Sequence, residues 1–476
     1  MIGLRNYCFP MVLVVLIITS AVFISEGEAS YYLKDSSGES IYLAGYGPYL
    51  HIRAVNWDYA SFHTKLQNHH INFYRLWPLH GFYEDEDIVS GKHQLIYSIN
   101  RDGKCDLTSF NQDYWNDLKS LLADARDKGI YVEISLFDDC SLEAHLSSRW
   151  TQHPFNKDNN TNGVFDFGLS ADNERDFYNL DNSALLYYQE LYVEKLIGET
   201  WPYDNVIYEV INEGDAGEKW IKYWVNFIDK EFDKYTTNRE PIIAHNAFPI
   251  NNPIYTGFDN PDIDLINWHT AIADAWEEYT RPDLIENLFK DHSGVKPQSY
   301  DEGPSLPPTI ATITDEIRRY ARGKMWFCFV NAGYVNIKHG LLEDYVDPVA
   351  YVDEILLDYF KYFGEFRMNF DFGNMIPHHE LVESVPSGMV THHTLADPGD
   401  DYVVYITGSA GVGEIRMDIV LGDGFYIGKW FDPKKGEFLP IPHEIEGGGK
   451  RSLELPKFNE DIVLYLTRRE PEKDVF

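Results

Sequence analysis

The sequence predicts an α/β fold, a (β/α)8 barrel of the TIM type, followed by a small all-β sandwich. Short apolar, β-branched runs alternate with amphipathic helical segments as far as about residue 363 of the 476-residue chain. Such βα units have right-handed crossovers and form a parallel sheet, and about eight of them favour a closed barrel. Beyond about Pro377 the helical pattern stops, and short alternating runs separated by Gly, Asp, Pro and Asn turns replace it.

The predicted barrel strands are apolar runs that end in polar residues or glycine. They are 41–50, 71–78, 130–138, 206–213, 241–246, 263–270, 296–302 and 325–333. The predicted helices have apolar residues at helical spacing, and they are 59–70, 111–128, 183–198, 218–235, 282–291, 312–322 and 348–363. The Asn/Pro-rich run 247–261 takes the place of a helix between the fifth and sixth strands.

The remaining part of the chain predicts a second domain. Its expected strands are 402–407, 414–420, 425–431, 451–455 and 462–466. We therefore divide the chain into a leader at 1–29, a barrel at 30–376 and a sandwich at 377–476. No low-complexity linker joins the last two parts, so the sandwich is expected to be docked on the barrel.

Charge and composition restrict the classes of partner. The chain has 40 Lys and Arg against 76 Asp and Glu, a formal net charge of −36. This charge repels nucleic acid phosphates and anionic lipid headgroups, so both are excluded as partners. Aromatic residues make up 15% of the chain, and many lie in predicted loops. That pattern is typical of sugar-binding clefts, although core packing explains most of these residues.

The amino terminus indicates export. Arg5 precedes an apolar run from residue 11 to residue 24, followed by the small-x-small site Gly27-Glu28-Ala29. These features predict a secretory signal peptide and a secreted, extracellular protein. The apolar run is short for a membrane span, and an uncleaved membrane anchor is the alternative interpretation.

Two of the four cysteines are candidates for a disulfide bond. Cys8 leaves with the signal, and Cys328 lies in a predicted apolar strand as an inert core thiol. Cys105 and Cys140 lie in segments expected on the same face of the barrel, and export permits their oxidation. The sequence fixes no geometry for this pair, so both the bonded and the reduced state stay open.

Two predicted strands deliver a glutamate to the same end of the barrel. The fourth strand ends in Asn212-Glu213, and the seventh ends in Glu302. Catalytic residues of such barrels lie at the carboxyl ends of the strands. Glycoside hydrolysis needs two carboxyl groups, one as proton donor to the leaving oxygen and one as nucleophile or base. The pair therefore predicts an enzyme that cleaves sugars.

Further residues are expected around this pair. Arg75 inside a barrel needs a carboxylate partner, and we expect it to pair with Glu302. Asn212 is expected to hydrogen-bond a sugar hydroxyl. The polar contacts expected beside it are His245, Asn246 and His269, and the expected stacking faces are Trp77, Trp150, Trp268 and Tyr300. Each tryptophan also fits a core position, and His269 also fits a buried, hydrogen-bonded histidine.

Three other acids are assigned lesser roles. Asp301 is expected to point to the opposite face from Glu302, because side chains alternate along a strand. Along their strands, Glu133 and Glu209 occupy positions whose side chains are expected to point into the barrel, but they lie deeper in it. We expect them to be structural partners of a buried Arg or Tyr.

The sequence predicts no metal ion and no cofactor. Residues 158–163 match the first half of a calcium loop, but Leu169 stands where the loop needs a glutamate. The His-His pairs lack further ligands at metal spacing, and no glycine loop precedes a helix to bind a nucleotide. Asn159-Asn160-Thr161 is an acceptor sequence for N-glycosylation.

At Arg75 in the motif YRLWP, Asn212-Glu213 and Glu302, the chain resembles clan A glycoside hydrolases, the (β/α)8 superfamily that contains the cellulase-like family 5. The run KWFDPKKGEF at 429–438 resembles a turn of the β-sandwich that follows apiosidase-like enzymes of this clan, often labelled a collagen-binding domain. The run HPFN at 153–156 is similar to barrel loops of that group. The chain departs from the clan at two positions: the predicted eighth strand ends in Asn331-Ala332-Gly333 instead of a tryptophan, and His269 stands where a tyrosine is common.

The resemblance implies a retaining glycoside hydrolase that acts on a carbohydrate substrate. Glu213 is then the acid/base and Glu302 the nucleophile, with their carboxyl groups about 5 Å apart. Two alternatives stay open: a transglycosylase that uses the same site, and a carbohydrate- or matrix-binding protein whose barrel is inactive.

Overall fold

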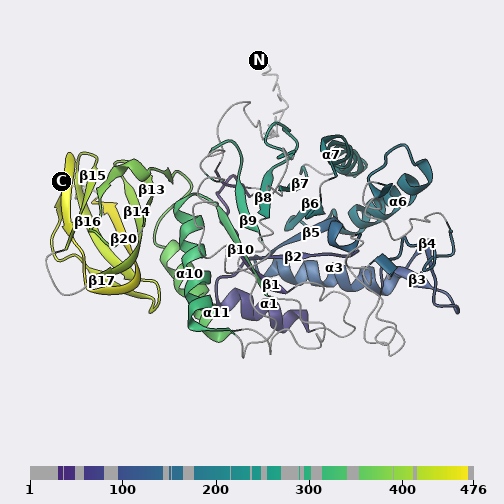
Figure 1. The fold of residues 1–476 in the computed structure, drawn as a ribbon, viewed down its shortest axis with the longest axis horizontal. Coiled ribbons are helices and arrows are strands. Elements are labelled where there is room, and N and C mark those ends of the chain that lie inside the picture. Colours follow the sequence, from purple (N-terminus) through teal and green to yellow (C-terminus); the bar gives the residue numbers. More distant parts are fainter. Residues whose placement is uncertain are drawn as a thin grey trace, which may run out of the picture.

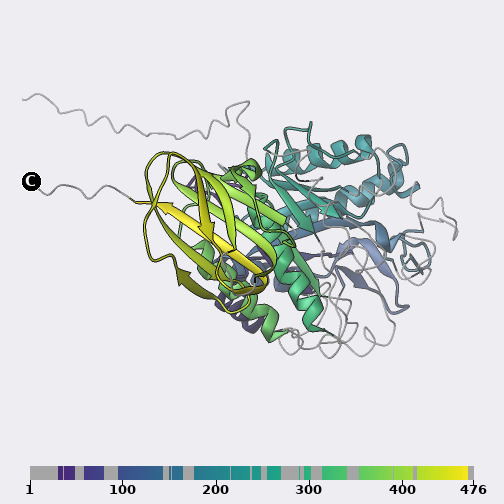
Figure 2. The ribbon, with the colours of Figure 1, turned by 60° about the vertical axis from the view of Figure 1, so that its left-hand side comes forward.

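The computed structural model describes a closed parallel barrel followed by antiparallel sheets (Figure 1). The residues that it describes are 31–35, 37–48, 58–79, 95–142, 150–151, 153–163, 176–214, 216–235, 239–247, 255–269, 289, 294–301, 313–339, 353–389, 391–410 and 415–469. The predicted (β/α)8 barrel with a carboxyl-terminal β-sandwich is confirmed. The sandwich lies at one end of the molecule, beside the helices α10 and α11 (Figures 1 and 2).

Eight parallel strands close the barrel. Along the chain they are β1 (Ala44–Pro48), β2 (Phe73–Leu76), β5 (Tyr131–Asp138), β6 (Val206–Asn212), β7 (Ile242–Ala247), β8 (Leu265–His269), β9 (Gln298–Asp301) and β10 (Tyr334–His339). Each strand pairs with its neighbour in the chain order, and β10 closes the ring by pairing with β1. Because all strands run in one direction, their carboxyl ends meet at one mouth, with β6 fourth and β9 seventh as the sequence predicts.

The helices follow the predicted amphipathic segments. They are α1 (Tyr59–Asn68), α3 (Gln112–Asp127), α6 (Ser183–Thr200), α7 (Glu218–Phe232), α10 (Asp315–Val330) and α11 (Glu354–Arg367). Most begin at a side chain that accepts a hydrogen bond from the first helical turn, as Asn111, Asn182 and Asp353 do. These caps satisfy amide groups that have no partner within the helix. The predicted helix 282–291 lies largely outside the described residues.

The predicted eighth strand was wrong. The run 325–333 forms the end of α10 and its cap, and the strand is the next segment, β10. Every residue of α10 from Met325 to Val330 is buried. A helix that is covered on all sides has no amphipathic period, so its sequence is indistinguishable from a buried strand. Cys328 is therefore a buried helical residue, and Asn331-Ala332-Gly333 does not lie at the barrel mouth.

The sandwich contains more strands than the sequence predicts. Its larger sheet has the order β11-β13-β14-β20-β16-β17, with β18 paired to β16, and its smaller sheet has the order β12-β15-β19. The bounds are β11 (Ile376–Pro377), β12 (Val382–Ser384), β13 (Thr391–Asp397), β14 (Asp401–Ala410), β15 (Arg416–Leu421), β16 (Phe425–Asp432), β17 (Glu437–Pro440), β18 (Ile445–Glu446), β19 (Gly449–Glu454) and β20 (Phe458–Arg468). A further hairpin of β3 (Tyr97–Ile99) and β4 (Cys105–Phe110) lies in a segment for which the sequence predicts no strand.

The sandwich is docked on α10, as expected. The buried Arg322 donates to the carboxylate of Asp461 at 2.9 and 3.0 Å and to Glu460 at 2.8 Å. Beside it, the Trp326 ring stacks on Tyr405 of β14 with the ring centres 6.2 Å apart. The core of the barrel continues through these contacts into the larger sheet of the sandwich.

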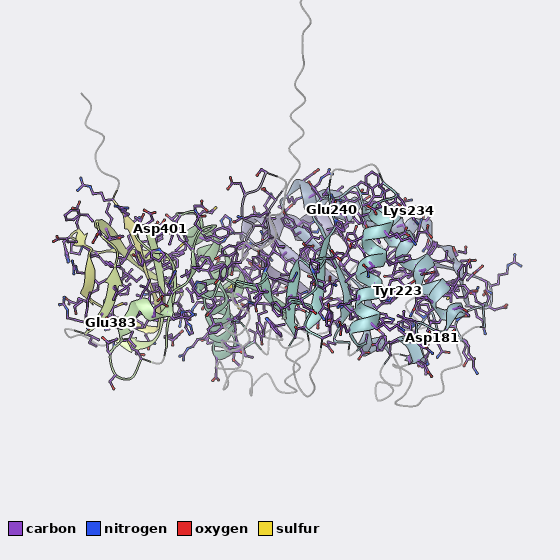
Figure 3. The ribbon with its side chains drawn as sticks, turned by 90° about the horizontal axis from the view of Figure 1, so that it is seen from above. Asp181, Tyr223, Lys234, Glu240, Glu383 and Asp401 are labelled. Carbon is purple, nitrogen blue, oxygen red and sulfur yellow. The ribbon has the colours of Figure 1, made fainter. Side chains whose placement is uncertain are left out.

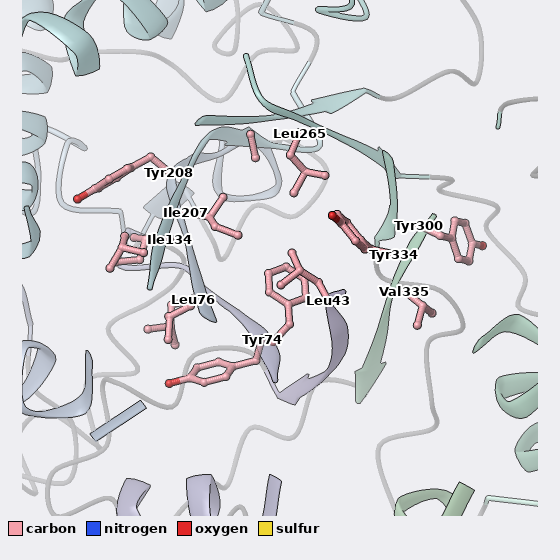
Figure 4. Close-up of a cluster of buried hydrophobic side chains, with 14 of the residues drawn as sticks. Leu43, Tyr74, Leu76, Ile134, Ile207, Tyr208, Leu265, Tyr300, Tyr334 and Val335 are labelled. Atoms are coloured by element: carbon pink, nitrogen blue, oxygen red, sulfur yellow. The ribbon is translucent and has the colours of Figure 1, made fainter. Parts of the chain in front are cut away.

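The barrel wall has an inner and an outer face. Figure 4 shows Tyr74, Tyr208 and Tyr300 pointing away from the barrel axis and Ile207 pointing inward. Tyr208 meets Phe232 of α7 on the outer side. The face on which a strand residue lies therefore decides whether it can reach the barrel mouth.

Figure 3 draws the described side chains and labels Glu240 on the barrel and Glu383 and Asp401 on the sandwich. In the described part of the chain, no helix combines the length and the apolar character that a membrane crossing requires.

Candidate active site

Polar side chains from six barrel strands converge on one buried arginine, Arg75 of β2, which is 1% exposed. Its Nε donates to Oε1 of Glu133 at 2.6 Å, and its Nη1 lies 2.5 Å from Oδ2 of Asp301. Its Nη2 donates to Glu209 and, at 3.1 Å, to Oδ1 of Asn212. One guanidinium thus holds three carboxylates and one amide from three other strands.

Asp301 is the carboxylate of β9 that Arg75 binds, so its side chain faces the barrel interior. The expected opposite orientation of Asp301 and Glu302 involves a residue outside the described part of the chain. Its Oδ2 also accepts from Nδ2 of Asn246 at 3.1 Å, and its Oδ1 from Nδ2 of Asn336 at 3.4 Å. The alternation along β9 places Tyr300 on the outer face and Asp301 on the inner face. Glu302, which the sequence paired with Arg75, lies outside the described residues.

Glu133 and Glu209 are fully buried partners of Arg75, as the sequence predicts. Nδ2 of Asn267 donates to both of them, at 2.9 and 3.0 Å. Burial raises the pKa of Glu133, the Glu209 carboxylate raises it further, and Arg75 opposes the change. Burial also raises the pKa of Glu209, against the opposing charge of Arg75. Both glutamates therefore favour the protonated form more than exposed glutamates do.

Asn212 and Asp138 end two adjacent strands and lie side by side. Nδ2 of Asn212 donates to Oδ1 of Asp138 at 2.9 Å. Ser141, in the short helix η2 (Asp139–Ser141), donates to the other carboxylate oxygen. A signal for Asp138 is present in the sequence, because Asp138 ends the predicted strand 130–138 just as Glu213 ends the predicted fourth strand.

Glu213 follows Asn212 in a left-handed backbone conformation, with φ of 56°. A residue with a side chain enters this region at an energetic cost and stays there only where the surrounding structure enforces it. Such residues cluster at functional sites. Gly214 comes next in a close turn, where an added Cβ atom would lie 2.4 Å from Cδ1 of Ile211. The turn that carries Glu213 out of β6 is therefore narrowly defined.

The structure brings together four of the predicted contact residues: Arg75, Trp77, Asn212 and Asn246. The Trp77 ring lies against the Arg75 guanidinium, with the ring centre 4.7 Å from the Cζ atom. Asn246 donates to Glu209 and Asp301. Arg75, Asn212 and Asn246 come from β2, β6 and β7, and Trp77 directly follows β2.

Three predicted contact residues lie on the outer face of the barrel instead. Nε2 of His245 lies 2.9 Å from the backbone oxygen of Tyr255, and burial lowers the pKa of His245 to about 4. Trp268 donates to Gln298 at 2.7 Å, and the Tyr300 ring lies 4.8 Å from Nζ of Lys324 in α10. The neighbours of His245 and Trp268 in sequence face inward and take part in the Arg75 cluster. Alternation therefore excludes all three from the barrel interior.

Trp150 is a fourth correction. It is 2% exposed and stacks on His153, with the ring centres 5.3 Å apart, in the segment that follows β5. The buried ring of Trp150 therefore packs in the core instead of forming an exposed stacking face. The side chains of His269 and Cys140 lie outside the described residues, as does the expected Cys105–Cys140 bond.

In the calcium-like run 158–163, side-chain oxygen atoms accept hydrogen bonds from backbone amides. Oδ1 of Asn160 accepts from the backbone amides of Asn162 and Gly163, and Oδ1 of Asn162 accepts from that of Leu107. Searched over the described residues, the chain has no group of three His, Cys, Asp or Glu side chains that could hold a metal ion.

The fold and this cluster define a closed (β/α)8 barrel with an arginine, carboxylates and asparagines at its carboxyl end. Among solved structures, the chain is similar to a glycoside hydrolase family 5 protein from Bacteroides vulgatus ATCC 8482, with a TM-score of 0.64 and 14% identity over 93% of this chain and 92% of that one. It is also similar to a structure described as a glycoside hydrolase, with a TM-score of 0.62 and 14% identity over 93% of this chain and 96% of that one. No family model and no curated protein matches the sequence significantly. At this identity the likeness establishes the fold.

Proposed function

We propose that the chain is a retaining glycoside hydrolase that cleaves O-glycosidic bonds of oligo- or polysaccharides. The observation that carries the proposal is the position of Asn212 and Glu213 at the end of β6, the fourth strand of a closed barrel, beside Arg75. In sequence, Glu302 directly follows Asp301, the last residue of the seventh strand. Carboxyl groups at these two strand ends can flank one glycosidic bond.

The proposed reaction has two displacements. Glu302 attacks the anomeric carbon while Glu213 protonates the leaving oxygen, which gives a covalent glycosyl-enzyme and releases the aglycone. Glu213, now ionised, then removes a proton from water, and the resulting hydroxide displaces Glu302 from the anomeric carbon. Two inversions retain the configuration. Asn212 is proposed to bind the sugar hydroxyl next to the reacting carbon.

The structural neighbours support this proposal through their fold, since both are described as glycoside hydrolases. The apiosidase-like subtype rests on the resemblance of 153–156 and 429–438 alone. A carbohydrate- or matrix-binding role for the sandwich has the same basis. Export likewise remains a proposal: residues 1–29 would be a signal peptide, and amino-terminal sequencing of the secreted protein should begin near residue 30.

One observation favours a second assignment of the nucleophile. Among the described residues, Asp301 is the carboxylate of β9 that binds Arg75, with Nη1 of Arg75 2.5 Å from its Oδ2. A 2-deoxy-2-fluoro glycoside traps the covalent intermediate, and peptide mass spectrometry then identifies the labelled residue. Label on Glu302 supports the first assignment, and label on Asp301 replaces it.

The function is tested with a panel of aryl glycosides and plant or microbial polysaccharides. Glu213→Ala and Glu302→Ala should each lower kcat by roughly three orders of magnitude or more while the protein stays folded. Glu437→Ala, an exposed glutamate of the sandwich, is the matched control. Near-normal turnover in either site variant would show that the assigned carboxylates are wrong.

Azide separates the two roles, because it can replace either lost carboxylate. Glu213→Ala should yield a glycosyl azide of retained configuration, whereas Glu302→Ala should yield one of inverted configuration. A product mixture in which an acceptor sugar outcompetes water would indicate the transglycosylase. Polysaccharide binding without release of reducing sugar, unchanged in Glu302→Gln, would indicate an inactive binding protein.

A further inference from the structure

The side-chain amide of Asn212 lies between two groups of opposite charge. Its oxygen accepts from Nη2 of Arg75 at 3.1 Å, and its nitrogen donates to Oδ1 of Asp138 at 2.9 Å. Asn212 and Asp138 are each 3% exposed. An amide has an acceptor end and a donor end, so only one orientation satisfies both neighbours. Rotation of the amide would turn its NH2 group toward a guanidinium and its oxygen toward a carboxylate.

Asp138 reaches this position because the alternation of inward and outward side chains is interrupted in β5. Phe137 points outward, where its ring lies 5.2 Å from that of Trp220 in α7, and the next residue, Asp138, points inward. Ser135, two residues before Phe137, lies beside the inward-facing Glu209. The hydroxyl of Ser135 donates to the backbone oxygen of Phe137 at 3.0 Å. That bond satisfies a backbone group at the point where the regular pattern breaks.

The same interruption occurs at the same level in β6. Glu209 and Asn212 are three residues apart, yet both contact Arg75, so alternation is lost between them. Phe137 pairs with Ile211, and Asp138 pairs with Asn212, in the register of the two strands. The matched breaks turn Asp138 and Asn212 inward together, one residue before the left-handed Glu213.

We propose that Asp138 is a positioning residue that fixes the orientation of the Asn212 amide and, through the shared backbone, the turn that presents Glu213. The proposal rests on the proposed function, because Asn212 and Glu213 are assigned to the sugar site there. Ser141 supports Asp138 by donating to its second oxygen. A buried carboxylate with both oxygens engaged holds its place, which a solvent-exposed group would not do.

The kinetic test is a double-variant cycle. Asp138→Ala should lower kcat by about 10- to 100-fold with little change in KM, because hydrogen bonds to the sugar strengthen in the transition state. Asp138→Asn, which retains an acceptor oxygen for Asn212, should recover most of that loss. The combined Asp138→Ala/Asn212→Ala variant should be no slower than Asn212→Ala alone. Losses that multiply would overturn the proposal, because they would show that Asp138 acts independently of Asn212.

A structural test does not depend on activity. A crystal structure of Asp138→Ala should show the Asn212 side chain rotated, with its oxygen beyond hydrogen-bonding distance of Arg75 Nη2, longer than about 3.5 Å. An unmoved Asn212 in a folded Asp138→Ala protein would refute the positioning role even if no glycoside is hydrolysed. Conversely, a wild-type protein that is inactive on every glycoside, combined with a rotated Asn212 in the variant, would refute the proposed function and leave the positioning role standing.

Discussion

Nη1 of Arg75 lies 2.5 Å from Oδ2 of Asp301, across the interior of the barrel from β2 to β9. The same guanidinium holds Glu133 and Glu209, so it is the shared cation of three buried acids. These contacts join the second, third, fourth and seventh barrel strands below the mouth. The position of the seventh strand, which Glu302 follows, is thereby tied to that of the fourth strand, which carries Glu213.

Removal of this cation is expected to destabilise the protein. Arg75→Ala leaves the buried carboxylates without their cation, and breaking such an ion pair typically lowers the free energy of unfolding by about 3–5 kcal/mol. Because Glu133 and Glu209 have raised pKa values in the folded protein, protonation stabilises the fold and ionisation at higher pH destabilises it. The drop in Tm should therefore be larger at pH 8 than at pH 5. Lys457→Ala, an exposed site, is the control, and an equal drop at both pH values would contradict the expectation.

The turn after Glu213 is predicted to tolerate no side chain at Gly214. In Gly214→Ala the new Cβ would meet Cδ1 of Ile211 at 2.4 Å and its Cγ1 at 2.9 Å, so the turn must move. We expect about a 10-fold or greater loss of kcat/KM, with a smaller change in stability. Ile211→Val deletes Cδ1, and the double variant Ile211→Val/Gly214→Ala should regain part of the activity. A double variant slower than Gly214→Ala would show that the clash is not the cause.

A pH-dependent stability is predicted for the outer helix α7. Burial, together with the nearby carboxylates of Asp262 and Asp264, raises the pKa of Asp229 to about 7. A raised folded pKa stabilises the fold at low pH, and this contribution is lost as pH rises from about 4 to about 7. Asp229→Asn should therefore raise Tm at pH 8 and change it little at pH 4. Asp423→Asn, an exposed aspartate of the sandwich, serves as the reference, and a variant without this pH dependence would contradict the assignment.

The barrel and the sandwich are predicted to unfold together. Arg322→Ala leaves the nearly buried Asp461 without its ion pair, for an expected loss of about 3–5 kcal/mol. Differential scanning calorimetry should show one transition for the wild type and for Arg322→Ala, shifted to lower temperature in the variant. Two separate transitions in the wild type would indicate that the two parts fold independently.

The sequence was sufficient to predict the alternation of strands and helices, the closed barrel and the strands β6 and β9, which Glu213 and Glu302 follow in sequence. These features follow from local patterns, because apolar period, helix caps and turn residues are read along a short window. The prediction failed where the burial of a segment does not follow from its local sequence pattern. The buried end of α10 lacks an amphipathic period, since the barrel covers it on one side and the sandwich on the other.

The inner and outer faces of the barrel were decided by the tertiary structure. His245, Trp268 and Tyr300 are residues of the types that bind sugars, and they lie close to the predicted strand ends. Their neighbours Asn246, Asn267 and Asp301 are the ones that reach the barrel interior. A shift of one residue along a strand exchanges the side chains that face inward with those that face outward. An interruption of this alternation, such as the one before Asp138, cannot be predicted from composition. The sequence alone thus determined which strands contribute to the site, whereas the closure of the barrel around Arg75 determined which side chains meet there, because side-chain direction depends on strand register and on partners distant in the chain.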